Sequence, residues 1–137
     1  MPVTTDEELA AALDAETIAV VGCSRTSGKA AHDVPRYMLQ QGYEVIPVNP
    51  HADEIFGRTA YDSLADVAEA VDLVDVFRPS DEVAPVVDDA IARDDVDTVW
   101  LQLGITDDES GERVEAAGKR FVQDRCLKVE HRRLAAV

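Results

Sequence analysis

Residues 18–29 read IAVVGCSRTSGK, in which four apolar residues run directly into a glycine and a short polar loop follows. A continuous apolar run of this length is typical of a strand that is buried on both faces of a parallel sheet. A glycine at the end of such a strand lets the backbone turn tightly or approach a ligand closely. The stretch therefore predicts a buried strand that leads into an anion-binding turn.

The rest of the chain repeats this alternation of strand-like and helix-like segments. Apolar runs predict strands over 18–22, 43–50, 73–77, 98–103 and 120–124. Apolar spacing and capping residues predict helices over 6–14, from 30–34 to 42, and over 63–70, 81–93 and 106–117, with Ser80 capping the helix over 81–93. After the last strand, Leu127 and Val129 alternate with Lys128 and Glu130, which predicts a final extended segment.

Strands that alternate with helices predict βαβ units and a parallel sheet. Because such crossovers are right-handed, the expected fold class is α/β, a doubly wound five-stranded sheet with helices on both faces. A chain of 137 residues has a usual size for one domain, so we expect residues 1–137 to form a single domain. In such sheets, ligands bind at the carboxyl ends of the strands, near the reversal in strand order. The candidate site is therefore the loops that follow the first four strands, 22–29, 48–51, 77–80 and 102–106.

The charge of the chain is strongly acidic, with 28 Asp and Glu against 13 Lys and Arg and a net charge of −15. The acidic residues are spread along the whole chain, which favours a solvated halophilic surface over a single acidic partner-binding face. Binding to nucleic acid requires a basic stripe that displaces counterions. We therefore expect no nucleic-acid partner.

Several other classes of protein are not expected. The sequence contains no run of about 18 apolar residues that would span a membrane. The acidic N-terminal segment does not resemble a signal peptide, so a cytoplasmic location is expected. Cys23 and Cys126 show no spacing that suggests a metal site, and no Ser-His-Asp or Cys-His-Asp arrangement can be recognised. We therefore assign neither metal ligands nor catalytic residues.

The loop after the first strand does not complete a dinucleotide-binding fingerprint. That motif requires G-x-G-x-x-G and an acidic residue near the end of the second strand, which binds a ribose diol. Here Ser24 stands at the position of the second glycine, and the second strand ends in Asn49. Both observations argue against an NAD site.

The same loop does not complete a P-loop. A P-loop requires four residues between its glycines and a Ser or Thr after its lysine. Five residues separate Gly22 from Gly28, and Ala30 follows Lys29. ATP hydrolysis at this loop is therefore not expected.

A more general anion-binding chemistry remains. Gly22 permits close approach of an anion, Ser24 can donate hydrogen bonds, and the following helix directs amide groups at the loop. Arg25, Lys29 and Arg78 add positive charge near one edge of the predicted sheet in a chain that is otherwise acidic. These features predict a phosphorylated ligand. The alternative is that Gly22 only makes a tight turn and that the basic side chains are surface counterions.

Six segments in order resemble the CoA-binding domain family, in particular its small single-domain YccU-type members. These segments are VVGCS, GYEVIPVNP, SLADV, VDVFR, VWLQLG and DRCLKVEH, and the resemblance extends from about residue 15 to residue 134. The resemblance implies a Rossmann-like domain related to the CoA-binding part of the succinyl-CoA synthetase α subunit. It also implies that CoA or an acyl-CoA is the ligand.

The resemblance places the ligand against the loops at the carboxyl ends of the strands. The implied contact residues are Gly22, Cys23, Ser24, Arg25 and Lys29 after the first strand, Val48, Asn49 and Pro50 after the second, Phe77 and Arg78 after the third, and Gln102 and Gly104 after the fourth. The first of these loops would contact the phosphates, and the last would close the site. The sequence departs from the family after Lys29, where Ala30-Ala31-His32 replaces the Pro-Ser-Tyr that often follows the basic residue.

Three hypotheses for function follow. The first is a stand-alone module that binds CoA or acyl-CoA without catalysis and has a regulatory or carrier role in CoA metabolism. The alternative is a subunit of a CoA-dependent acyl-CoA synthetase or transferase that acts with an unlinked partner. An NAD(P)-binding domain is the third. Exposed strand edges would also permit a homodimer.

Individual side chains carry their own expectations. Cys23 is either a small buried residue beside the strand or a thiol that faces the CoA thiol, and the first alternative is favoured. Trp100 and Cys126 are expected to pack in the fold. His51 follows the second strand and could approach a ligand, whereas His131 is expected to be exposed.

Overall fold

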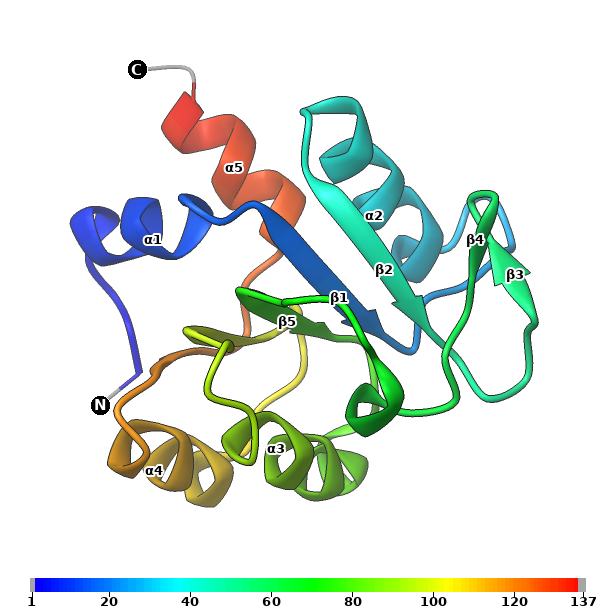
Figure 1. The fold of residues 1–137 in the computed structure, drawn as a ribbon. Helices are drawn as coiled ribbons and strands as arrows, with labels where there is room; N and C mark the ends of the chain where they lie inside the picture. Colours follow the sequence, from blue (N-terminus) through cyan, green and yellow to red (C-terminus); the bar gives the residue numbers. More distant parts are fainter. Residues whose placement is uncertain (1, 136–137) are drawn as a thin grey trace.

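The structure, a computed structural model, describes residues 2–135. Its central sheet contains five parallel strands in the order β2-β1-β5-β6-β7, of which Figure 1 labels β2, β1 and β5. The strands are β1 (Thr17–Val21), β2 (Glu44–Val48), β5 (Leu73–Val76), β6 (Thr98–Leu101) and β7 (Arg120–Val122). The predicted doubly wound parallel sheet of five strands is confirmed.

Helices cover both faces of this sheet (Figure 1). One face carries α1 (Asp6–Leu13), α2 (Ala30–Gln40) and α5 (Leu127–Ala135), and the other carries α3 (Val83–Ile91) and α4 (Asp108–Ala116). Among residues 2–135, no helix is long and apolar enough to span a lipid bilayer. The two layers of helices bury the sheet between them.

The opening apolar run forms β1, which is buried along its whole length. Alternate residues of a strand point to opposite faces of the sheet. Ile18 and Val20 join the core beneath α1, α2 and α5, whereas Ala19 and Val21 join the core beneath α3 and α4. Burial on both faces explains why this strand is continuously apolar.

The strand order reverses between β1 and β5. After β2, the chain returns to the other side of β1 and adds β5, β6 and β7 in sequence. Beyond the outer edge of β2, Tyr61 forms a single parallel bridge with Val48. The amide of Asn49 donates to the Tyr61 carbonyl at 2.8 Å, and the Tyr61 amide donates to the Pro47 carbonyl at 3.1 Å. Tyr61 thus stands where a Rossmann fold has its third strand, and the sheet is Rossmann-like.

A short hairpin between β2 and Tyr61 was not predicted. It pairs β3 (Glu54–Ile55) with β4 (Arg58–Thr59), and its turn residues Phe56 and Gly57 have positive φ. The ring of Phe56 lies 4.8 Å from the ring of His32 at the start of α2. This contact packs His32 against the hairpin.

The predicted extended segment after β7 is wrong, because Leu127 begins helix α5. The helix buries Leu127 and Glu130, which are three residues apart and share one face. Its first turn is stabilised by Gln102, whose side-chain oxygen accepts from the Leu127 amide at 3.0 Å. The prediction that His131 is exposed is also wrong, since the side chain is half-buried and lies 2.8 Å from the Tyr37 hydroxyl.

The predicted helix over 63–70 is reduced to a single 3₁₀ turn, η1 (Leu64–Asp66). The guanidinium of Arg93 donates to the carbonyls of Leu64, Val67 and Glu69 at 2.9–3.1 Å. The Leu64 carbonyl also accepts the 3₁₀ hydrogen bond from the Val67 amide at 3.2 Å, and beyond this turn Arg93 holds the segment in an irregular conformation. A long-range partner of this kind cannot be deduced from the local sequence pattern.

The prediction that Ser80 caps the helix over 81–93 is also wrong. Ser80 belongs to a 3₁₀ turn, η2 (Ser80–Glu82), which precedes α3, and its side chain makes no capping hydrogen bond. Instead, the Ser80 hydroxyl accepts from the Thr106 amide at 3.1 Å. The side chain thus joins the turn after β5 to the turn after β6.

Candidate functional site

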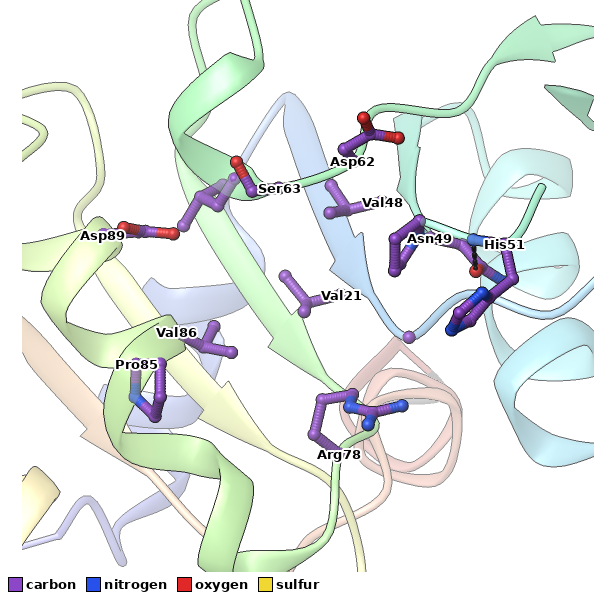
Figure 2. Close-up of a pocket in the computed structure, with 13 residues that line it drawn as sticks. Val21, Val48, Asn49, His51, Asp62, Ser63, Arg78, Pro85, Val86 and Asp89 are labelled. Carbon is purple, nitrogen blue, oxygen red and sulfur yellow. Dashed lines mark hydrogen bonds between the residues drawn. The ribbon is translucent and has the colours of Figure 1, made fainter. Parts of the chain in front are cut away.

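A cavity of about 370 Å³ lies where the strand order reverses, between the carboxyl ends of β1, β2 and β5 and helix α3 (Figure 2). We call it the switch-point cavity. Its lining residues are Val21, Gly22, Val48, Asn49, Pro50, His51, Asp62, Ser63, Leu64, Arg78, Pro85, Val86 and Asp89. Its position is the one at which doubly wound sheets bind ligands, and its volume falls within the usual range for small-molecule sites.

Gly22 brings three strand ends together at this cavity. Its amide donates to the Val48 carbonyl at 2.9 Å, and the Phe77 amide donates to the Val21 carbonyl at 2.8 Å. Gly22 has φ +87°, and a Cβ at this position would lie 2.8 Å from the Phe77 carbonyl oxygen. Glycine is therefore required here by the close approach of the turn after β5.

The turns after β1 and β2 are joined by the side chain of Asn49. Its amide nitrogen donates to the Cys23 carbonyl at 2.9 Å, and its oxygen accepts from the His51 amide at 2.8 Å. Both ends of the side chain are thus used to hold the loops. This arrangement fixes the position of His51 at the cavity.

The cavity has ends of different charge. Figure 2 shows Arg78 and His51 toward one end and Ser63 and Asp89 toward the other. Arg78 forms an ion pair of 2.5 Å with Glu82. Burial raises the pKa of Asp89, and the neighbouring Asp88 and Asp66 raise that pKa further. Such a cavity suits a ligand with an anionic part at one end and hydrogen-bond donors at the other.

Cys23 lies behind this cavity, and its side chain is fully buried. Burial raises the pKa of its thiol to about 12, and Asp75 contributes to the same shift. A thiol with this pKa is not a reactive thiolate at neutral pH. The interpretation of Cys23 as a small packed residue is confirmed.

The rest of the loop after β1 is folded on itself. The Ser24 amide donates to the Ala31 carbonyl at 2.9 Å, and the Ser24 hydroxyl accepts from the Thr26 amide at 3.0 Å. The Gly28 amide donates to Asp33 at 3.2 Å. This hydrogen bond lowers the pKa of the Asp33 carboxyl. The carboxyl also uses the Gly28 amide, which could otherwise donate to an anionic ligand.

Arg25 and Lys29 extend from the same loop and are exposed. Within residues 2–135, neither side chain forms an ion pair with a carboxylate. They do not line the switch-point cavity, although they lie at the same edge of the sheet. Both charges are therefore available to a ligand that extends beyond the cavity.

The remaining predicted site residues lie outside the cavity lining. Phe77 is half-buried and packs against the core on the α2 side of the sheet. Gln102 is buried and binds the start of α5. The Gly104 amide donates to Asp124 at 2.7 Å. The structure thus brings together Gly22, Val48, Asn49, Pro50 and Arg78, while the turn after β6 shapes the neighbouring part of the edge.

The sequence did not indicate the far wall of the cavity. Asp62 and Ser63 reach it because Tyr61 pairs with Val48, and a one-residue bridge leaves no sequence pattern. Val86 and Asp89 lie on α3, three residues apart, so their helical spacing was a usable signal. No group of His, Cys, Asp or Glu among the described residues could hold a metal ion.

Comparison with known proteins gives relatives along nearly the whole chain. YneT from Bacillus subtilis, an uncharacterized protein, is 37% identical over 114 residues, which cover 83% of this chain and 84% of YneT. The solved structure of cell-free ID.343 from Thermus thermophilus is 45% identical, with a TM-score of 0.90, and the match covers 96% of this chain and 99% of that one.

The chain is also similar to part of a much larger enzyme. It is 29% identical over 110 residues to the ADP-forming acetate–CoA ligase II from Archaeoglobus fulgidus, a match that covers 79% of this chain but 16% of the ligase. The family model described as CoA binding domain matches residues 16–132. The chain therefore belongs to the CoA-binding domain family.

Proposed function

We propose that this chain binds CoA or an acyl-CoA at the switch-point cavity as a module without catalytic activity of its own. In this role it acts as a regulator or carrier in CoA metabolism. The observation that carries the proposal is the position of the cavity at the reversal of strand order in a member of the CoA-binding domain family.

In this proposal, the anionic part of the ligand lies toward Arg78 and His51. A phosphate there would receive charge-assisted hydrogen bonds from Arg78, and the exposed charges of Arg25 and Lys29 would attract phosphates farther along the edge. The apolar walls formed by Val48 and Val86 suit the flat faces of an adenine ring. Asp89, at the other end, is placed to accept hydrogen bonds from amino or hydroxyl groups.

One observation favours a second kind of ligand. A dinucleotide-binding fold has an acidic residue near the end of its second strand, where this chain has Asn49. Asp62, in the neighbouring segment, lines the same cavity and supplies a carboxylate there. A carboxylate in this region can bind the diol of an unphosphorylated ribose. NAD is therefore the competitor against which CoA must be compared.

Isothermal titration of the chain with CoA, ADP, NAD and ATP tests the proposal. We expect CoA to bind more tightly than NAD. Arg78→Gln should weaken CoA binding by about tenfold to a hundredfold, because it removes a charge-assisted hydrogen bond to phosphate. Arg132→Gln removes the same charge from an exposed site on α5 and is the matched control. Absence of CoA binding, or equal affinities for CoA and NAD, would refute the proposal.

The similarity to an ADP-forming acetate–CoA ligase favours the alternative of an enzyme subunit. In that case, the chain would present CoA to a separate chain that supplies the nucleotide-dependent chemistry. Formation of acyl-CoA from acid, CoA and ATP in a mixture that requires this chain would support the alternative. Acyl-CoA formation that is independent of the chain would leave the binding module as the function.

A further inference from the structure

A second hollow lies at the carboxyl ends of β6 and β7, beside the start of α5, and we call it the outer groove. It has a volume of about 610 Å³, and its lining includes Leu103, Thr106, Cys126 and Val129. Leu103 is 68% exposed and Val129 is 55% exposed, and they are the two large hydrophobic side chains that residues 2–135 leave exposed. Because both of these side chains line the same groove, the groove suits an apolar ligand.

The polar groups of the outer groove are largely engaged with one another. Asp124 accepts from the Gly104 amide at 2.7 Å, and Gln123 accepts from the Asp107 amide at 2.9 Å. Arg125 pairs with Glu130 at 2.9 Å. A ligand in the groove would therefore meet mainly the apolar surfaces of Leu103 and Val129.

The outer groove and the switch-point cavity lie on one continuous rim. Arg78 lines the cavity, and two residues later the Ser80 hydroxyl accepts from the amide of Thr106, which lines the groove. The groove lies at the ends of β6 and β7, which are one and two strands away from β5. Since neighbouring strands are about 4.8 Å apart, the groove lies about 5–10 Å along the edge from the end of β5, where Arg78 lines the cavity.

The pantetheine arm of CoA can cover this separation. It contains as many backbone bonds as about four residues of extended chain, which span at most about 14 Å. A CoA whose nucleotide occupies the switch-point cavity can thus place its sulfur in the outer groove. The thioester-linked acyl group would then follow the sulfur into the groove.

We propose that the outer groove binds the acyl group of an acyl-CoA, with Leu103 and Val129 as the contacts that favour acyl-CoA over free CoA. This inference rests on the proposed function, because the nucleotide must occupy the switch-point cavity. Removing apolar surface from water stabilises a complex in proportion to the area buried. The dissociation constant should therefore fall by about two- to fourfold for each methylene group that enters the groove.

Titrations with CoA, acetyl-CoA, butyryl-CoA and hexanoyl-CoA test the inference. For the wild-type chain, we expect affinity to increase with acyl length. Leu103→Ser and Val129→Thr alter exposed side chains, so the fold should be retained. Both variants should bind free CoA like the wild type and lose most of the increase with acyl length. Val86 lines the switch-point cavity, so Val86→Thr should weaken the binding of all four ligands by the same factor.

The outcomes separate the two proposals. If CoA does not bind the wild-type chain, the proposed function fails. If CoA binds but hexanoyl-CoA binds no more tightly, only the acyl groove is refuted. An increase with acyl length that survives in both Leu103→Ser and Val129→Thr would also refute the groove, because the acyl group would then lie elsewhere.

Discussion

Asp75 is a carboxyl group buried in the middle of the sheet. It lies on β5 between Val20 of β1 and Trp100 of β6, it is fully buried, and neither of its oxygens has a hydrogen-bond partner. Burial raises the pKa of Asp75 well above its ordinary value of 3.8. The side chain is therefore neutral in the fold at pH values where it is charged in the unfolded chain.

This raised pKa predicts how stability depends on pH. Between pH 3.8 and the pKa of the folded state, the folded chain holds a proton on Asp75 that the unfolded chain has lost. The Asp75 contribution to the free energy of unfolding thus falls as pH rises, by about 1.4 kcal/mol per pH unit. In Asp75→Asn this contribution is absent, so the variant should gain stability relative to the wild type as pH increases.

Urea unfolding of the wild type and Asp75→Asn from pH 5 to pH 8 measures this difference. Asp81 is exposed, so Asp81→Asn is the control and should leave the pH dependence of the free energy of unfolding unchanged. A constant difference between Asp75→Asn and the wild type over this range would show that Asp75 is ionised in the fold.

A second residue-scale prediction concerns Gly22. In Gly22→Ala, the added Cβ would meet the Phe77 carbonyl oxygen at 2.8 Å, and the residue would keep φ +87°. Gly42 has φ +98°, and a Cβ added there would meet no atom within 4 Å, so Gly42→Ala introduces only the backbone strain. We expect the backbone strain to lower the free energy of unfolding of both variants by about 1–3 kcal/mol. The loss should be larger in Gly22→Ala than in Gly42→Ala, because only the first also has the close contact with Phe77. Equal losses in denaturant unfolding would mean that the turn after β5 moves aside easily.

At the element scale, α5 shows how a local pattern can mislead. Leu127 to Glu130 alternate apolar and charged residues, which is a strand pattern, but four residues are too few to distinguish a strand from a helix. In the helix, the acidic Glu130 is on the buried side, where Arg125 and Arg133 pair with its carboxylate at 2.9 and 3.0 Å. A buried acid of this kind looks in the sequence like a solvent-facing residue.

The same ion pairs give a prediction for α5. Glu130 is 7% exposed, and Glu130→Gln keeps its size but removes the charge that pairs with two arginines. The variant leaves Arg125 without a charged partner beside a buried side chain, so we expect a loss of about 1–3 kcal/mol in the free energy of unfolding. Asp6→Asn removes an exposed partner of Arg133 and should have a much smaller effect. Similar losses in the two variants in urea unfolding would show that burial does not strengthen the Glu130 pairs.

At the scale of the whole molecule, the sheet and the edge at which the switch-point cavity lies could be predicted from the sequence. Each strand is a local apolar run, and each run ends in a recognisable turn, as Val21 and Gly22 illustrate. The cavity could be predicted only in part, because its far wall depends on long-range contacts. Asp62 is placed by the pairing of Tyr61 with Val48, and Leu64 by the hydrogen bond from Arg93. Neither contact leaves a pattern in the neighbouring residues.

The net charge of −15 gives a prediction for the molecule as a whole. Repulsion among like charges destabilises the compact state, and salt screens it, since the Debye length falls from about 10 Å at 0.1 M to about 3 Å at 1 M. Because most of this screening is complete near 1 M, the melting temperature should rise steeply at low KCl concentration and then level off. A sucrose series without added salt is the control, because sucrose stabilises folded chains by exclusion from the surface and leaves charge repulsion unscreened. A melting temperature that falls with KCl, or that rises with KCl in proportion to concentration as it does with sucrose, would show that repulsion among the acidic side chains does not limit stability.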